Sequence, residues 1–424
     1  MIRFLLKGIL RDRGRSLFPL LVVTAGVFLT VAFYGYILGM MNNMIRSNAN
    51  LRHGHVKVMT RAYAQDIAQV PNELALTGVA ALSDELRTSY PDLDWVARIP
   101  FGGLLDVPDD EGETRIQAPV AGLAVDLRTS GGPEPGLLGL AKILVRGRMP
   151  RVPGELLMSD ELARKLGLDI GGKATLITTT MAGSLAMANF TVAGTIRFGI
   201  RAMDRTGLIA DLADLRRALD MDDAAGEVLG LFKDGIYRSD RAAAVLRSFE
   251  GRYAGRQGEF LPAMQTLAEQ PGMDIIIGRM RYATSAIVFI FLLAMSLVMW
   301  NAGLVGTLRR YGEFGLRLAI GEAKGHVYRT MLAESLLIGV LGSTAGTVLG
   351  LSLSWYLQVH GIDVSSIMKN ITFLMDTVLH SKITPLSFVI GFIPGLLASL
   401  IGTAIAGRTI YKRQTARLFK ELES

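Results

Sequence analysis

Hydrophobic residues gather in four long runs that are unevenly spaced along the chain. The runs cover residues 16–41, 283–308, 330–358 and 385–407. Each has about the 20 apolar residues that an α-helix needs to cross roughly 30 Å of hydrocarbon, at a rise of about 1.5 Å per residue. The pattern therefore predicts four membrane helices, with a long polar stretch between the first and the second.

The polar stretch, residues 42–282, mixes segments with the period of strands and segments with the period of helices. Strands are predicted at 55–59, 95–100, 116–122, 174–178 and 190–196, and helices at 80–89, 159–166, 212–219 and 238–251. The predicted fold class is a membrane α-helical protein with four transmembrane helices in a one-plus-three layout. A large α/β domain is expected between helices 1 and 2.

The net charge of +7 is distributed in a way that predicts the orientation of the chain in its membrane. Lys and Arg cluster in the basic N-terminus 1–15, the segment 309–329 and the tail 408–424, each beside an apolar run. By the positive-inside rule these three parts are cytoplasmic. The domain 42–282 and the loop 359–384 then face the periplasm. Basic clusters beside apolar runs are membrane anchors that contact lipids, so we expect no nucleic-acid partner.

The first apolar run is longer than the 7–15 residues typical of a signal-peptide core, so we interpret it as an uncleaved anchor. The chain contains no cysteine, which excludes disulfides and thiolate chemistry. His53 and His55 would share one face of a strand, but no third metal ligand is evident. Residues 167–173 fit the start of a phosphate-binding loop, yet Ala174 stands where a hydroxyl is needed. We predict no metal, no catalytic residue and no enzymatic activity in this chain.

The segment 309–329 interleaves apolar, charged and glycine residues between the second and third runs. A short helix here would either dock into a groove on a cytoplasmic partner or serve only as an amphipathic connector at the membrane surface. In the third run, Gly342, Gly346 and Gly350 recur every four residues, which predicts close helix packing within one subunit or between two.

Residues 313–321 read EFGLRLAIG, which is similar to the E-x-G-x-x-R-A-x-G pattern of FtsX/MacB-type ABC transporter permeases, a family that includes the LolC/LolE-like permeases. Arg317 lies one place from the arginine of the pattern, and Leu318 stands where the family commonly has arginine. VRGRMPRVPGEL at 145–156 and FTVAGTI at 190–196 resemble the MacB-like periplasmic core domain of that family. With the span layout and the basic tail, the resemblance covers essentially the whole chain.

The resemblance implies a permease of the bacterial inner membrane that pairs with a second copy or a paralogue and with a cytoplasmic ABC ATPase dimer. ATP and Mg would bind to that separate ATPase, and this chain would hold no cofactor. The mechanism, called mechanotransmission, would couple ATP hydrolysis to motion of the periplasmic domain. The residues expected to couple to the ATPase are Glu313, Phe314, Gly315, Arg317, Leu318, Ala319 and Gly321.

Three functions occur among permeases of this type, and the sequence favours release or export of a lipoprotein or other amphiphile. The alternatives are an FtsX-like transmitter that regulates a periplasmic enzyme, and MacB-like efflux of a drug or peptide. A substrate cavity is expected to be lined by Phe28, Phe33, Tyr34, Phe289, Phe291 and Met295.

A periplasmic chaperone, adaptor or lipoprotein is a further expected partner. LolC-type permeases carry a proline-containing hook for a chaperone, but the equivalent stretch here, 179–189, is short and lacks proline. Met181, Leu185 and Met187 would make the contact instead, unless the loop simply packs against the domain.

Overall fold

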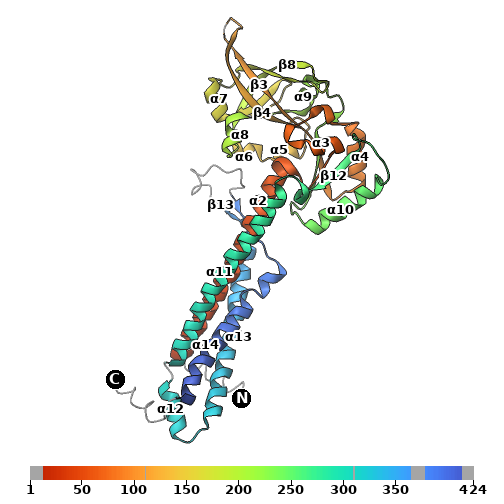
Figure 1. The fold of residues 1–424 in the computed structure, drawn as a ribbon. Helices are drawn as coiled ribbons and strands as arrows, with labels where there is room; N and C mark the ends of the chain where they lie inside the picture. The colour runs from red at the N-terminus through yellow and green to blue at the C-terminus, as the bar shows by residue number, and fades with distance from the viewer. Residues whose placement is uncertain (1–12, 110, 309–310, 364–377, 413–424) are drawn as a thin grey trace. The chain divides into compact units, whose positions relative to one another are not determined.

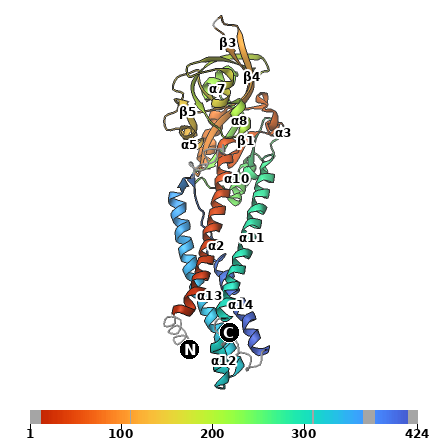
Figure 2. The same ribbon diagram turned by 90° about the vertical axis from the view of Figure 1, so that its left-hand side faces the viewer.

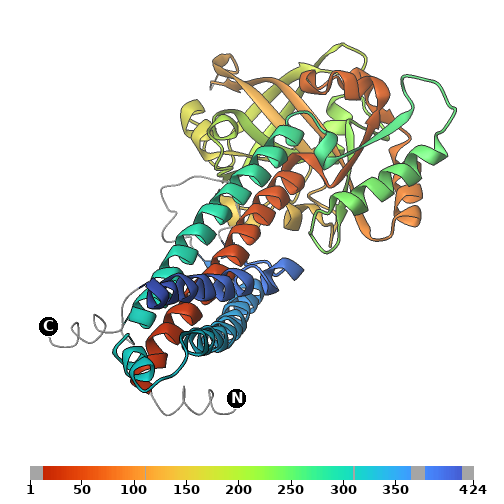
Figure 3. The same cartoon turned by 60° about the horizontal axis from the view of Figure 1, so that its bottom comes forward.

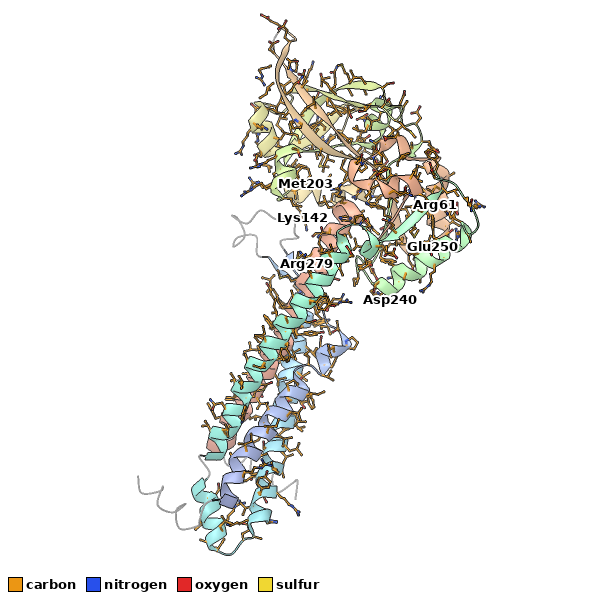
Figure 4. The ribbon with its side chains drawn as sticks, viewed as in Figure 1. Arg61, Lys142, Met203, Asp240, Glu250 and Arg279 are labelled. Carbon is orange, nitrogen blue, oxygen red and sulfur yellow. The ribbon has the colours of Figure 1, made fainter. Side chains whose placement is uncertain are left out.

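The computed structural model describes residues 13–109, 111–308, 311–363 and 378–412 (Figure 1). Residues 1–12, 110, 309–310, 364–377 and 413–424 lie outside the described residues. They include parts of the predicted N-terminus, the segment 309–329, the loop 359–384 and the tail. The chain forms two compact units. Of the described residues, 13–41, 279–308, 311–363 and 378–412 form the helical unit, and Asn42–Gly278 forms the α/β unit. The chain passes between the units inside two helices, and Arg279, labelled in Figure 4, is the first residue of the helical unit after the second passage.

The helical unit is built on four long helices, of which α2, α11 and α13 exceed the predicted runs in length. α2 (Arg13–Asn48), α11 (Met273–Leu308), α13 (Lys324–His360) and α14 (Phe392–Lys412) alternate with the short α12 (Tyr311–Ala319) and the 3-10 turn η5 (Pro385–Phe388). Four helical segments among the described residues are long and apolar enough to span a membrane. The fourth predicted run starts in η5, and its regular α-helix begins only at Phe392.

The glycine row of α13 lies against α2 of the same chain. A Cβ atom placed on Gly346 would lie 2.6 Å from the carbonyl oxygen of Thr24, and one on Gly350 would lie 2.7 Å from Cβ of Val31. Gly342 makes a similar approach to Val23. The absence of side chains in this row therefore permits α2 and α13 to pack backbone to backbone. On its other side α13 lies beside α14 (Figure 3).

The α/β unit is organised around a ten-stranded sheet of order β12-β1-β11-β3-β4-β9-β6-β8-β5, in which β7 also pairs with β3 and β8. Its strands are β1 (Val56–Thr60), β3 (Leu93–Pro108), β4 (Thr114–Val125), β5 (Leu144–Gly147), β6 (Glu155–Ser159), β7 (Lys173–Thr179), β8 (Leu185–Ile196), β9 (Gly207–Asp211), β11 (Glu227–Phe232) and β12 (Pro262–Thr266). β3 and β4 form a long hairpin (Figure 2).

Helices pack around this sheet, and a large buried cluster of apolar side chains forms the core of the unit. The helices are α3 (Arg61–Gln65), α4 (Val79–Ser89), α5 (Glu134–Leu137), α6 (Leu140–Ile143), α7 (Asp160–Leu166), α8 (Arg201–Thr206), α9 (Leu212–Ala218) and α10 (Ser239–Arg252). Two-residue strands complete the structure: β2 (Leu76–Thr77) pairs with β10 (Ala224–Ala225), and β13 (Ile362–Asp363) of the helical unit pairs with β14 (Val378–Leu379). Each strand and helix predicted in this domain overlaps an observed one.

Local chemistry explains why α7 begins and ends where it does. The Ser159 hydroxyl accepts a hydrogen bond from the amide of Leu162, and Gly167 ends the helix in a left-handed conformation with φ +63. The stretch that resembles a phosphate-binding loop is therefore a helix end leading into β7.

The prediction that His53 and His55 share one strand face is wrong. His53 ends a π-helical turn, η1 (Ala49–His53), and Gly54 separates it from His55 with φ +67, a conformation outside the β region. His55 is fully buried, and its Nδ1 atom accepts a hydrogen bond from the amide of Phe232 at 2.8 Å. His55 lies in the interior of the α/β unit and His53 is half-buried, so the two side chains have different surroundings.

The stability of the α/β unit should depend on pH through His55. Burial lowers its pKa from 6.5 to about 4, with a further contribution from Arg46 and Arg241 and an opposing one from Asp234. Because the unfolded chain takes up the proton first, the stabilisation is complete above pH 6.5 and is lost as the pH falls towards about 4. The loss should be about 3 kcal/mol, measurable as a lower unfolding temperature of the detergent-solubilised chain. The variant His55→Gln should lack this part of the pH dependence, and an unchanged profile would contradict the assignment.

Candidate functional site

The short helix α12 and the turn that follows it form the most distinctive local structure beside the apolar helices. The amide of Gly321 donates to the carbonyl of Leu318 at 3.2 Å, and the amide of Glu322 donates to the carbonyl of Arg317 at 3.1 Å. This pair of hydrogen bonds is a Schellman motif, which requires a left-handed residue at its corner. Gly321 supplies it with φ +96. The glycine therefore sets the sharp turn between α12 and α13.

The two sides of α12 have different surroundings. Leu318 packs against Val327 and Met331 of α13, which anchors the helix. Leu316 of α12 and Ile320, the first residue after α12, are 57% and 77% exposed. The amide of Ile320 donates to the carbonyl of Leu316 at 3.1 Å, which keeps the two side chains on one face and makes them the exposed apolar pair of α12. An anchored helix with an exposed apolar pair suits either of the two roles expected from the sequence, docking on a partner protein or lying at the membrane surface.

The predicted coupling residues occupy several sides of this helix. Gly315 is buried, Glu313, Arg317 and Leu318 are half-buried, and Ala319 is exposed. Phe314 belongs to the same helix, but its side chain lies outside the described part of the structure. The predicted set omitted Leu316 and Ile320, although their spacing of four residues in a charged segment was visible in the sequence.

The residues expected to line a substrate cavity do not form one surface. The rings of Phe33 and Phe291 stack on each other with centroids 4.2 Å apart. Tyr34 is buried and Met295 packs into the interior of the helical unit, whereas Phe289 is 65% exposed. Phe28, also in the set, is half-buried. Aromatic residues that face lipid, a partner or the bundle interior look alike in sequence. The sequence therefore could not show which of these six residues share a surface.

An extended segment crosses α2 near the end of α13. The amide of Lys382 donates to the carbonyl of Gly35 at 3.0 Å, and that of Ser381 donates to the carbonyl of Leu357 at 3.4 Å. A Cβ atom on Gly39 would lie only 1.8 Å from the carbonyl oxygen of His380. The two glycines of α2 thus admit a piece of extended backbone that ties α2 to α13.

The stretch 179–189, predicted to be a loop, is largely strand. It forms a hairpin in which β7 and β8 pair, with Leu185 and Met187 71% and 65% exposed on one face. Met187 pairs across to Ile177, which is half-buried and pairs in turn with the exposed Leu104, so apolar residues form a row across three strands. Met181 instead lies in the turn, packs against the main core and donates its amide to Leu219. The three predicted contact residues are therefore not one surface.

Comparison with known proteins shows that the part of the chain after residue 284 is similar to a permease family. Residues 285–415 match the family described as FtsX-like permease C-terminal. Lipoprotein-releasing system transmembrane protein LolC of Xylella fastidiosa (strain 9a5c) is 26% identical over 216 residues, which is 49% of this chain and 49% of that protein. LolC of Haemophilus influenzae is 23% identical over 261 residues, covering 60% of this chain and 61% of that protein.

Two MacB proteins are also similar. Macrolide export ATP-binding/permease protein MacB of Mannheimia succiniciproducens is 27% identical over 154 residues, 36% of this chain and 23% of that protein. The periplasmic region of MacB from Actinobacillus actinomycetemcomitans superposes with a TM-score of 0.35 at 10% identity, covering 55% of this chain and 96% of that one.

The chain spans about half the length of the curated LolC relative from Xylella that it matches, 49% of that protein. The matched region includes α13 and α14 and the turn that Gly321 forms. Four apolar helices and permease relatives of this kind make it a protein of the bacterial inner membrane. The match of residues 285–415 and the LolC and MacB relatives together support the FtsX/MacB/LolC-type family of ABC transporter permeases for this chain.

Proposed function

We propose that this chain is the permease subunit of an ABC transporter that works by mechanotransmission. A separate cytoplasmic ATPase dimer binds ATP and Mg, docks on the chain and drives motion of the α/β unit in the periplasm. The motion releases lipoproteins or other amphiphiles from the inner membrane. Two LolC proteins, each named as part of a lipoprotein-releasing system, match 49% and 60% of this chain, compared with 36% for the macrolide exporter.

The exposed apolar pair on α12 is the observation that carries this proposal. Leu316 and Ile320 face away from α13, to which Leu318 holds the helix. Apolar side chains presented on a charged helix at a membrane surface suit a groove on a partner protein. Because α13 follows directly after the Gly321 turn, a force applied to α12 acts on a helix that packs along α2.

The proposal places both termini and α12 in the cytoplasm and the α/β unit in the periplasm, as the positive-inside rule predicts. The native chain has no cysteine, so single labels can test this directly. A cysteine at the exposed position Ser130 should react with an impermeant maleimide added to spheroplasts. A cysteine at the exposed position Ala323 should react only after the membrane is opened. The reverse pattern would contradict the orientation.

The row of apolar residues on the sheet, exposed except for the half-buried Ile177, is the proposed contact for a periplasmic chaperone, adaptor or lipoprotein. Met187, Leu185, Ile177 and Leu104 contribute to it. Methionine adapts to irregular apolar partners, which suits the binding of varied ligands. Met181 has no part in this surface because it packs against the core.

Depletion of the protein in its native bacterium tests the substrate class. We expect acylated lipoproteins to accumulate in the inner-membrane fraction within a few generations, while the profile of secreted peptides is unchanged. Normal lipoprotein sorting combined with loss of cell-wall hydrolase activity would instead identify a transmitter, and sensitivity to macrolides alone would identify an exporter. Either result would overturn the lipoprotein assignment.

A further inference from the structure

The carboxyl end of α2 continues into the α/β unit as the π-helical turn η1. Two backbone carbonyl groups of η1 accept hydrogen bonds from side chains that are distant in the sequence. The amide of Gly54 donates to the carbonyl of Ala49 at 2.7 Å, the five-residue step of a π-helix. Such turns are rare and are found mostly at functional positions. The turn leaves carbonyl oxygens of η1 available for bonds to other elements.

Arg98 of β3 binds one of these carbonyls. Its Nη1 atom donates to the carbonyl of Leu51 at 2.8 Å, while Nε and Nη2 donate to the two carboxylate oxygens of Glu134 at 2.7 Å each. Arg98 is 0% and Glu134 1% exposed. The bidentate pair fixes the plane of the guanidinium group, which in turn fixes the position of η1 on the sheet.

Gln270 binds a second carbonyl and lies three residues before α11, the other helix that passes between the units. Its Nε2 atom donates to the carbonyl of His53 at 2.8 Å, and its Oε1 atom lies 2.8 Å from Nδ1 of the same histidine. The backbone carbonyl of Gln270 accepts from the amide of Met273, the first residue of α11, at 3.0 Å. One buried residue thus joins the end of α2–η1 to the start of α11.

Apolar contacts reinforce the same connection. Ala49 of η1 and Met273 of α11 are buried in one cluster with Leu229 and Leu231 of β11. Ile45 of α2 and Ile277 of α11 pack against this cluster from outside. Both helices are therefore attached to the same strand as well as to each other.

We propose that Arg98 and Gln270 are positioning residues that form a yoke, in which α2 and α11 are held to each other and to the sheet as one body. The yoke comprises Arg98, Glu134, His53 and Gln270 with the carbonyl of Leu51. A displacement of either helix is then passed to the whole α/β unit instead of being absorbed at the junction. Its role in transmission rests on the proposed function, but the mechanical link is a property of this chain alone.

Distances between spin labels in the full-length, cysteine-free chain test the link without any ATPase. Labels at Ile276→Cys on α11 and Leu185→Cys on β8 report the distance between this helix and the sheet. Both positions are exposed and therefore suitable for labelling. Labels at Leu185→Cys on β8 and Asp84→Cys on α4 report a distance within the α/β unit that does not involve α11. The chain is placed in lipid nanodiscs and diluted with unlabelled chain, and the distance distributions are measured by double electron–electron resonance. We expect Gln270→Leu to widen the first distribution at least twofold and to leave the second unchanged.

Gln265→Leu is the matched control, because this glutamine of β12 has a buried Oε1 atom without a hydrogen-bond partner and belongs to no part of the yoke. It should leave both distributions unchanged. If Gln270→Leu does not accumulate, Gln270→Asn, one methylene too short to reach His53, should widen the first distribution as well. An unchanged width in the glutamine-270 variants, or widening of both distributions, would overturn the yoke.

A second readout separates the yoke from the proposed function. In the complex with the co-purified ATPase, Gln270→Leu should retain ATP hydrolysis and gain a nucleotide-dependent shift between the labels on α11 and the sheet. The unmodified chain should lack this shift, because the yoke holds α11 and the sheet as one body. A widened distribution in Gln270→Leu that nucleotide does not shift would support the yoke and count against mechanotransmission.

Discussion

Replacing Leu316 and Ile320 together by glutamate should abolish retention of the ATPase by the purified chain. The two side chains are the exposed apolar face of α12, and a charge placed in an apolar interface must be desolvated without a partner. Interface positions of this kind contribute about 2–4 kcal/mol each, which corresponds to roughly 30–1,000-fold in affinity per residue. The measurement is the amount of ATPase that co-purifies from solubilised membranes with the tagged chain.

Two further variants make this result specific to α12. Ala323→Glu adds the same charge at an exposed position just before α13, outside the apolar pair, and should leave retention near normal. Gly321→Val should weaken retention, because φ +96 is unfavourable for a β-branched residue and the turn would have to move. Normal retention with the double glutamate variant would remove α12 as the docking element.

Replacing Arg98 by methionine should strongly destabilise the α/β unit. Arg98 is fully buried, and its removal leaves the carboxylate of Glu134 buried and unpaired. Breaking a buried ion pair from one side costs about 3–5 kcal/mol, which lowers the unfolding midpoint of a unit of this size by roughly 10 °C. Trp95, buried in the core of the same unit, reports the transition by fluorescence in the detergent-solubilised chain.

The double variant Arg98→Met with Glu134→Met should recover much of the lost stability, because both charges are then removed. Arg87→Met breaks an exposed pair with Asp84 and should change the midpoint little. If Arg98→Met unfolds no earlier than Arg87→Met, the buried pair does not hold the junction together.

Features set by short-range chemistry were predictable from the sequence. The four apolar runs, the strand–helix alternation and the ends of α7 at Ser159 and Gly167 all follow from patterns a few residues long. The alternation of Leu185, Met187 and Asn189 with alanines also marked β8, but the comparison with a hook led to a loop being predicted there.

Features that depend on contacts far apart in sequence were not predictable. His53 and His55 have the spacing of one strand face, and only the left-handed Gly54 and the bond to Gln270, 217 positions away, show why they differ. The pairing of Phe33 with Phe291 likewise depends on the arrangement of two helices. An apolar pattern indicates that a residue is buried or binds lipid or protein, but not which of these applies.

The most direct measurement is affinity purification of the unmodified chain from its native membrane in mild detergent, followed by mass spectrometry of the retained proteins. We expect an ABC ATPase in near-stoichiometric amount, with lipid-modified proteins enriched when hydrolysis is blocked by vanadate. A chain that purifies intact, with its α/β unit folded, but retains no ATPase would contradict the proposed coupling.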